Sequence, residues 1–168
     1  RNSHGAILGA FRKGEYDILL GTQMVAKGLD YPNITTVGVL DADISLMIPD
    51  FRSGERTFQL LAQVAGRTGR GTKKGQVVIQ TSLPNAFPIR CAVKHDYRTF
   101  AERELLARSR FNYPPFTRLM RILAKSSDAK LAKDFCDSIR ETVASLAESH
   151  GIDMLGPSLA PLARLDGK

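Results

Sequence analysis

Three short apolar runs, with a helical pattern between two of them, constrain the fold of this 168-residue chain most strongly. The runs are YDILLG (16–21), ITTVGVLDAD (34–43) and QVVIQTS (76–82), each rich in β-prone residues. In residues 54–65, apolar side chains recur at helical spacing: Phe58, Leu61, Ala62 and Ala65. Strands that alternate with helices predict an α/β fold with a buried parallel sheet.

A short helix is also expected near residues 3–13, where Ile7, Leu8 and Phe11 have helical spacing and Gly14 marks the end.

The pattern changes after these runs. Pro84 and Pro88 interrupt regular structure, and NYPPF (112–116) is a second interruption, because consecutive prolines force an extended path. Between them, DYRTFAERELLARSR (96–110) is strongly helical and charged. A helix bounded by two proline-rich breaks is typical of a linker between domains.

The last part of the chain has the pattern of a second, truncated domain. An alternating run at 118–126 predicts a strand, and an amphipathic helix is expected over 128–150, ended by Gly151. The residues IDMLGP (152–157) begin another apparent strand. This order predicts a β-α-β piece of an α+β domain.

Composition indicates a globular protein with a basic surface. The apolar content is 43% and the formal net charge is +7, which makes a polyanionic partner plausible. No apolar run reaches the roughly 18–20 residues that span a bilayer, so no membrane partner is expected and the cytoplasm is the expected location. Cys91 and Cys136 are far apart and form no CxxC pair, so we expect two core thiols and no metal site.

The stretch QLLAQVAGRTGRG (59–71) places two arginines at the end of the expected helix. Arg67 and Arg70 are three residues apart and share a face, and a guanidinium forms bidentate, charge-assisted bonds to phosphate. Gly66 and Gly69 suit positions where the backbone passes close to a partner. The alternative is a simple helix end, with arginine near the helix dipole and glycine as a C-cap.

The stretch GTQMVAKGLDYP (21–32) combines polar groups that a mere connector does not need. Thr22, Gln23 and exposed backbone N–H groups can hold a nucleic-acid phosphate, Lys27 adds a cation, and Asp30 can accept hydrogen bonds from ribose. The alternative is a loop closed by an ordinary turn at Asp30.

Both stretches are expected at one rim of the sheet. Ligands of strand-helix sheets bind at the carboxyl ends of the strands, where residues 21–32 and 41–50 should lie, with the arginines directed at the same rim. Asp41 and Asp43 end a strand there, and either cap the next turn or take part in the mechanism.

These residues carry a family resemblance. GTQMVAKGLDYPNITTVGVLDAD resembles motif V, and QVAGRTGR resembles motif VI, of superfamily 2 helicases. More narrowly, PDFRSGERTFQLL, GQVVIQT and YPPF in this order resemble the primosomal replication-restart helicases, the primosomal protein N′ (PriA) family. The resemblance implies a second RecA-like helicase lobe at 1–88, a linker helix at 89–114 and a partial α+β C-terminal domain at 115–168.

The same resemblance implies roles for motif VI. Arg67 and Arg70 would contact the γ-phosphate across the cleft between lobes, with Arg70 as the arginine finger, and Gln63 would couple to the opposite lobe.

For motif V, the resemblance implies that Gly28 and Asp30 lie on the nucleotide side. Thr22 and Gln23 would contact the phosphates of single-stranded DNA, and Lys27 stands where related motifs often carry arginine.

Some parts of such a motor are absent from the sequence. There is no GxxxxGK[ST] loop and no acidic Walker B box, so ATP hydrolysis with Mg²⁺ is expected only with the missing first helicase lobe. The zinc-binding cysteine module of the family is also absent. The partners implied are single-stranded or forked DNA, primosome proteins and single-strand binding protein.

Two other classes remain open. The second lobe of an excision-repair helicase subunit has a similar motif order, although PDFR and YPPF argue against it. A non-catalytic nucleic-acid or protein-interaction module could also keep a RecA-like lobe as its scaffold.

Charged and aromatic side chains near the linker allow two interpretations each. Three arginines form a solvated, ion-paired helix face or contact the DNA backbone: Arg103, Arg108 and Arg110. Three aromatic residues pack the linker against the lobe or stack on a base: Phe111, Tyr113 and Phe116.

Overall fold

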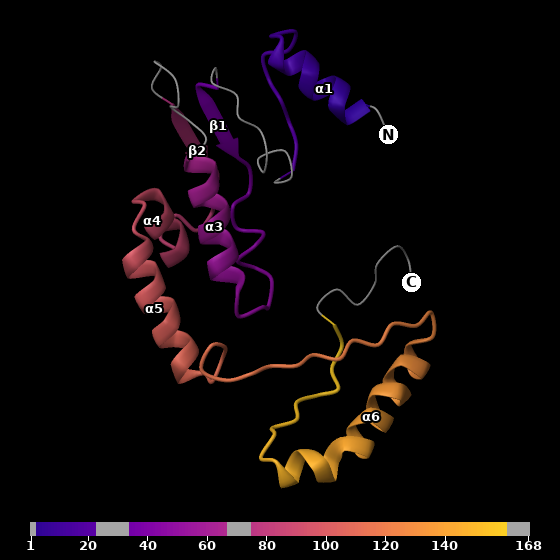
Figure 1. Ribbon diagram of the computed structural model, residues 1–168. Helices are drawn as coiled ribbons and strands as arrows, with labels where there is room; N and C mark the ends of the chain where they lie inside the picture. Colours follow the sequence, from indigo (N-terminus) through magenta and orange to yellow (C-terminus); the bar gives the residue numbers. More distant parts are fainter. Residues whose placement is uncertain (1–2, 23–33, 67–74, 161–168) are drawn as a thin grey trace. The chain divides into compact units, whose positions relative to one another are not determined.

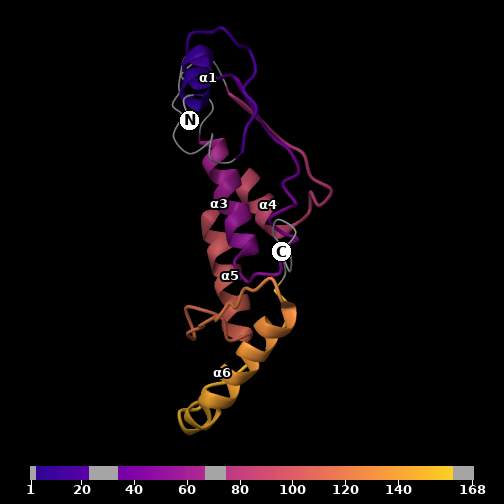
Figure 2. The same ribbon diagram turned by 90° about the vertical axis from the view of Figure 1, so that its right-hand side faces the viewer.

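A computed structural model describes residues 3–22, 34–66 and 75–160 (Figures 1 and 2). The chain divides into two compact units, the first ending at Phe116 and the second beginning at Thr117. In chain order, the elements are α1 (Ser3–Arg12), β1 (Thr36–Val39), α3 (Ser53–Ala65), β2 (Gln76–Ile79), α4 (Phe87–Val93), α5 (Tyr97–Arg110) and α6 (Ala129–Ser149).

The sheet of the described residues consists of β1 and β2. The two strands are parallel, with Thr36 opposite Gln76 and Val39 opposite Ile79, which confirms the predicted α/β class with a parallel sheet. Exposed and half-buried residues alternate along both strands, so the expectation of strands buried on both faces is wrong for this structure.

The strand expected at residues 16–21 does not form. This segment has no regular secondary structure, and Ile18 and Leu20 are 85% and 81% exposed. A β-strand satisfies its backbone N–H and C=O groups through a neighbouring strand, and among the described residues β1 pairs with β2 alone. An apolar sequence is therefore not sufficient to make this segment a strand. By contrast, the predicted helix at 3–13 is confirmed by α1, and Gly14 follows it with φ +79°.

Helix α3 forms the centre of the core. It was predicted from its apolar spacing, and it buries Thr57, Phe58, Leu61 and Val64 on one side. Phe58 and Leu61 pack with Ile89 of α4 and Phe100 of α5 in one hydrophobic cluster. Each fully buried side chain of this size contributes about 1.5–3 kcal/mol of hydrophobic stabilisation. Packing against α4 and α5, seen side by side with α3 in Figures 1 and 2, fixes the position of α3.

Helix α4 was not predicted, because Pro88 was interpreted as a break. Pro88 lies in the first turn of α4, where its missing N–H has no intrahelical acceptor to lose. The helix buries Ile89, Cys91 and Ala92, and burial raises the pKa of the Cys91 thiol. A proline that was expected to interrupt structure therefore begins a helix.

The charged segment 96–110 is confirmed as a helix by α5. Asp96 caps it by accepting a 3.0 Å hydrogen bond from the Thr99 backbone N–H. The side-chain hydrogen bond from Thr99 also lowers the pKa of Asp96.

The second unit contains α6, which confirms the helix predicted at 128–150. Asp128 accepts a 2.8 Å hydrogen bond from the Lys130 N–H at its start, and Gly151 follows its end with φ +63°. The strands expected at 118–126 and from residue 152 are absent from the described residues, which have no regular structure there. None of the helices in the described part of the chain is long and apolar enough to cross a membrane.

Candidate nucleotide and single-strand site

The structure describes two of the eight predicted site residues. Gln63 lies near the end of α3 and is half-buried, and Thr22 is exposed. The other six predicted site residues lie outside the described residues: Gln23, Lys27, Gly28, Asp30, Arg67 and Arg70. The structure therefore shows the elements that hold the site and the points where the two motifs join the described chain.

Both motifs join the described chain at the amino end of the sheet. Residues 23–33 lead into β1 through Ile34 and Thr35, and residues 67–74 lead into β2 through Gly75. The backbone N–H of Gln76 donates a 2.8 Å hydrogen bond to the carbonyl oxygen of Thr35, so these two entry points are adjacent. Segments about 40 residues apart in sequence thus meet the sheet at one place.

The expectation of a shared carboxyl rim falls on residues that lie almost entirely outside the described ranges, within 23–33 and 67–74, and it stays a prediction. Because β1 and β2 are parallel, the chain between them must return from the carboxyl end of β1 to the amino end of β2. Helix α3 lies in this return path and ends at Ala65, before the chain re-enters the sheet at Gln76. The carboxyl end of β1 and the residues that lead into the strands, Thr35 and Gly75, therefore lie at opposite edges of the sheet.

The carboxyl edge is closed by Asp43, which is buried. Its carboxylate accepts hydrogen bonds from the Thr81 hydroxyl and, at 2.6 Å each, from the Ser82 backbone N–H and hydroxyl. The hydrogen bonds from Ser82 and Thr81 lower the pKa of Asp43. Asp43 thus joins the chain after β1 to the chain after β2, which is a structural role. Its side chain bonds to Thr81 and Ser82 across the sheet and not to the turn that follows it in sequence.

Gly66 follows α3 directly and leads into motif VI. Its backbone is right-handed, with φ −73°, and a Cβ added to it would lie 3.7 Å from the carbonyl oxygens of Ala62 and Gln63, which is ordinary contact. The left-handed C-cap that favours glycine is therefore not the reason for glycine here. Crowding inside the described chain does not explain it either.

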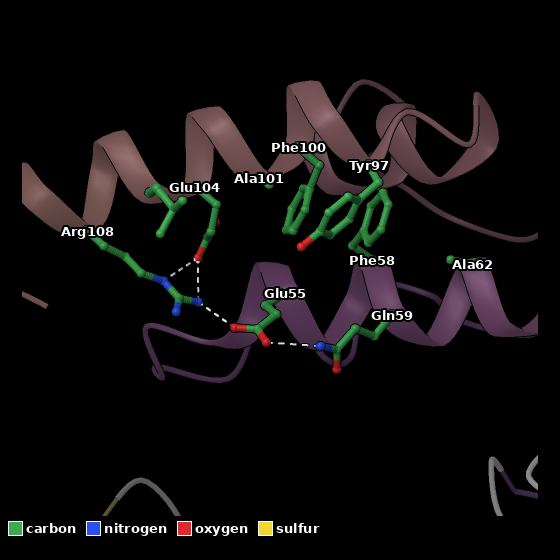
Figure 3. A pocket seen from close by; sticks show the side chains of 10 residues that line it. Glu55, Phe58, Gln59, Ala62, Tyr97, Phe100, Ala101, Glu104 and Arg108 are labelled. Carbon is green, nitrogen blue, oxygen red and sulfur yellow. Dashed lines mark hydrogen bonds and ion pairs between the residues drawn. The ribbon is translucent and has the colours of Figure 1, made fainter. Parts of the chain in front are cut away.

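Between α3 and α5 the first unit has an open pocket of about 440 Å³ (Figure 3). Its aromatic side is formed by Phe58, Tyr97 and Phe100, and Phe58 stacks on Phe100 with ring centroids 4.3 Å apart. Glu55 and Arg108 form its polar side. The pocket cannot be recognised from the sequence, because the residues of α3 and α5 that line it are about 40 positions apart.

Arg103 and Arg108 of α5 make contacts with other side chains of the first unit. Arg108 forms ion pairs with Glu55 and Glu104, at 2.6 and 2.9 Å. The guanidinium of Arg103 lies 4.4 Å from the ring centroid of Phe87. For Arg108 the ion-paired interpretation is therefore confirmed.

Of the three aromatic residues after α5, one packs on the first unit and two are exposed. Tyr113 stacks on Phe51 with centroids 5.0 Å apart and ring planes 7° from parallel, which confirms that it packs the end of the linker on the lobe. Phe111 and Phe116 remain exposed.

The described residues offer no metal centre. Within 3–22, 34–66 and 75–160, no group of three or more His, Cys, Asp or Glu side chains could hold a metal ion. The described part of the site fixes where α3 ends and where β1 and β2 begin.

Two family models match successive parts of the chain. Residues 2–72 match the model described as helicase conserved C-terminal domain. Residues 109–168 match the model described as primosomal protein N C-terminal domain.

Curated relatives extend the similarity over most of the chain. The replication restart protein PriA of Bacillus subtilis (strain 168) is 46% identical over 167 residues, which cover 98% of this chain and 20% of the relative. The protein of the same name from Borreliella burgdorferi is 41% identical, covering 92% and 23%, and that from Chlamydia trachomatis is 49% identical, covering 78% and 18%. The chain spans about a fifth of the length of the curated relatives it matches. The chain therefore belongs to the family of the replication restart protein PriA.

Proposed function

We propose that this chain supplies the second half of an ATP-dependent DNA helicase that acts in replication restart and primosome assembly. In this proposal Arg67 and Arg70 reach the γ-phosphate of ATP bound by a first helicase lobe, and Arg70 is the arginine finger. Such a group stabilises the charge that develops on the transferred phosphoryl group and is worth about 10³–10⁵ in rate. Gln63 couples α3 to the first lobe.

One observation carries this proposal: the entry points of motifs V and VI are adjacent. The hydrogen bond between Gln76 and Thr35 joins the two strands where residues 23–33 and 67–74 lead back into the described chain. A nucleotide bound beside this edge could be reached from both motifs. Gly28 and Asp30 would then serve its ribose and phosphate side, with Arg67 and Arg70 at the γ-phosphate.

The glycine at the end of α3 supports close approach by a partner. The right-handed backbone of Gly66, with φ −73°, does not itself require glycine. A ligand or a second lobe that packs against the backbone there would exclude a Cβ.

Single-stranded DNA is the second ligand we propose, with Thr22, Gln23 and Lys27 as phosphate contacts. These contacts carry no sequence information, so binding by the isolated chain should be weak, independent of sequence and sensitive to salt. Titration of a labelled single strand at low and high salt tests this, and tight binding that salt does not weaken would contradict it.

The remaining parts of the motor lie elsewhere in this proposal. ATP is held chiefly by the first lobe, which also provides the Mg²⁺ carboxylates; Mg²⁺ would neutralise phosphate charge. Residues 1–88 form the helicase lobe, 89–114 the linker, which contains most of α4 and all of α5, and 115–168 a C-terminal domain for forked DNA, primosome proteins and single-strand binding protein. The protein works in the cytoplasm, where bacterial DNA is replicated.

The proposal is tested in a chimera in which this chain replaces the matching 167 residues of the Bacillus subtilis relative. The intact chimera should hydrolyse ATP in the presence of single-stranded DNA. Arg70→Ala should lower turnover by about 10³-fold or more while nucleotide binding survives. Lys94→Ala, at an exposed cap residue of α4, is the matched loss of a positive charge and should change little. Turnover of Arg70→Ala within a few-fold of the parent would remove Arg70 from the mechanism.

A further inference from the structure

We propose that Arg108 is a positioning residue for ATP hydrolysis: it holds the start of α3 against α5 and so sets where the far end of α3, with Gln63, lies. This inference rests on the proposed function, because it concerns the helix that leads into motif VI. The residues involved, here called the Arg108 cluster, are Phe51, Glu55, Glu104, Arg108 and Tyr113.

The guanidinium of Arg108 is committed to internal contacts. Its side chain is 13% exposed, and Nη2 donates to Glu55 at 2.6 Å and to Glu104 at 2.9 Å, while Nε donates to Glu104 at 3.1 Å (Figure 3). Nη1 lies 3.5 Å from the carbonyl oxygen of Pro114. Burial alone would lower the pKa of Arg108, but the hydrogen bonds to Glu55 and Glu104 outweigh it and raise the pKa. These contacts leave little of the group available for DNA.

The bond to Glu55 is the one that joins two helices. Glu55 lies in the first turn of α3, and Arg108 lies in the last turn of α5, 53 residues later. A guanidinium is a planar fork, so a partly buried pair of this kind restricts direction as well as distance. Glu55 also accepts a 2.9 Å hydrogen bond from Gln59, which extends the contact one turn along α3.

Aromatic contacts hold the same corner from the other side. The guanidinium carbon of Arg108 lies 5.0 Å from the ring centroid of Phe51, and the ring of Tyr113 stacks on Phe51 with centroids 5.0 Å apart. Phe51 precedes α3 by two residues, and Tyr113 lies just beyond α5. The cluster therefore holds the residues before α3 together with the residues after α5.

Helix α3 also fits closely against its neighbours near this corner. A Cβ added at Gly54 would lie 3.3 Å from Cγ of Pro88 and 3.5 Å from Oε2 of Glu104. Farther along, Phe58 stacks on Phe100. The start of α3 thus has little freedom while the cluster is intact.

A small loss of this restraint would be amplified at the other end of α3. From Glu55 to Ala65 the helix rises about 15 Å, so a tilt of about 4° at its start moves its end by about 1 Å. A misplacement of about 1 Å far from the chemistry can cost up to about 100-fold in rate. Gln63 and the entry to motif VI lie at this end.

The test uses the chimera described above, with Arg108→Met and Arg108→Lys compared with Arg98→Met. Arg98 pairs with Glu102 on the same helix but is 90% exposed, so it is the matched control. Arg108→Met should lower kcat for DNA-dependent ATP hydrolysis by about ten-fold, with KM for ATP unchanged. Arg108→Lys should recover part of the loss, and Arg98→Met should have no effect.

A double-mutant cycle separates positioning from stability. Glu55→Gln should lower kcat in the parent but not in Arg108→Met, because the two residues act through one contact. Assays are run well below the Tm of each variant. If Arg108→Met lowers Tm but leaves kcat as in the parent, the positioning role is wrong and the cluster is only structural.

A second measurement keeps this inference separate from the proposed function. In the intact 168-residue chain, hydrogen exchange should become faster at the amides of residues 62–66 in Arg108→Met and stay unchanged in Arg98→Met. Unchanged exchange in both variants would overturn the inference whatever the chimera does. An inactive parent chimera, with the exchange result as expected, would instead overturn the proposed function.

Discussion

The region α3–α4–α5 and the described residues beyond Phe116 contain similar apolar sequences but differ in how they bury them. In the first region Phe58, Leu61, Ile89 and Phe100 lie in one buried cluster. In the second, the buried residue among those described is Ala147, and Met120, Leu155 and Leu159 are each more than 85% exposed.

The difference shows which elements can form from local sequence alone. Helix α6 has its cap, its amphipathic spacing and its terminal Gly151, and it forms with little burial. The runs on either side of it lack a paired neighbour in the described structure and form no strand. Helices therefore follow from local pattern, whereas strands and cores require a second surface.

The largest expected loss of stability comes from a substitution in the core of the first region. Phe100→Ala should lower the free energy of unfolding by about 3–5 kcal/mol, because it removes a buried ring stacked between Phe58 and Phe87. Chemical denaturation followed by circular dichroism measures the loss.

Phe135→Ala in α6 is the control for this change. Its ring is 57% exposed, so the cost should stay within about 0.5 kcal/mol. Equal losses for the two variants would show that the regions are not different in packing.

Acidification is expected to weaken the first region before the second. The pKa of Asp43 is lowered from 3.8 by the hydrogen bonds from Ser82 and Thr81, so its stabilisation is complete above about pH 4. It is lost as the pH falls through the lower pKa of the folded state.

The pH dependence can be followed by fluorine or proton NMR of each region from pH 6 to pH 2. Asp43→Asn should remove part of the dependence in the first region, where hydrogen bonds also lower the pKa values of Asp50 and Asp96. A first region that unfolds no earlier than α6 would contradict the role given to Asp43.

Most helices could be predicted from sequence, and one could not. The spacing of Phe58 and Leu61 and the cap at Asp96 specify α3 and α5 locally. Helix α4 was not predicted, because a proline can either occupy the first turn of a helix or interrupt regular structure, and the sequence alone does not separate the two cases. In the structure, the burial of Ile89 shows that Pro88 begins a packed helix.

The site was less accessible to sequence reasoning than the fold. The motifs identified Arg67, Arg70 and Asp30 as candidates, and they remain predictions. Their expected position at the carboxyl rim of the sheet also stays a prediction, because residues 23–33 and 67–74 lie outside the described ranges. The Arg108 cluster was also missed, since Glu55 and Arg108 meet only after α3 and α5 pack.

A smaller effect is expected at the end of α6. Gly151 has φ +63°, and a Cβ there costs about 1–2 kcal/mol, so Gly151→Ala should lower the helix content of the second unit. Because nothing lies within 4 Å of the added Cβ, the loss is one of backbone conformation.

Gly151→Asn is the matched control, since asparagine tolerates this conformation better. Circular dichroism and the chemical shifts of residues 145–152 report the change. If alanine and asparagine cost the same, the left-handed backbone is not the cause.

The smallest effect sharpens the comparison between buried and exposed ion pairs. Arg98→Met removes a 2.9 Å pair with Glu102 in which both side chains are largely exposed, so the loss should be about 0.2–0.5 kcal/mol. Adding 0.5 M NaCl should remove most of the difference from the parent, as measured by Tm. A loss that high salt leaves intact would indicate a contact other than the ion pair.

Helices α3, α4 and α5 form a fixed support for the site through their shared core. Native-state hydrogen exchange on the 168-residue chain tests it most directly, because it measures the opening of each helix separately. We predict that the amides of residues 57–64 exchange at least about 100-fold more slowly than those of residues 133–146. Equal rates, or slower exchange in α6, would contradict the account.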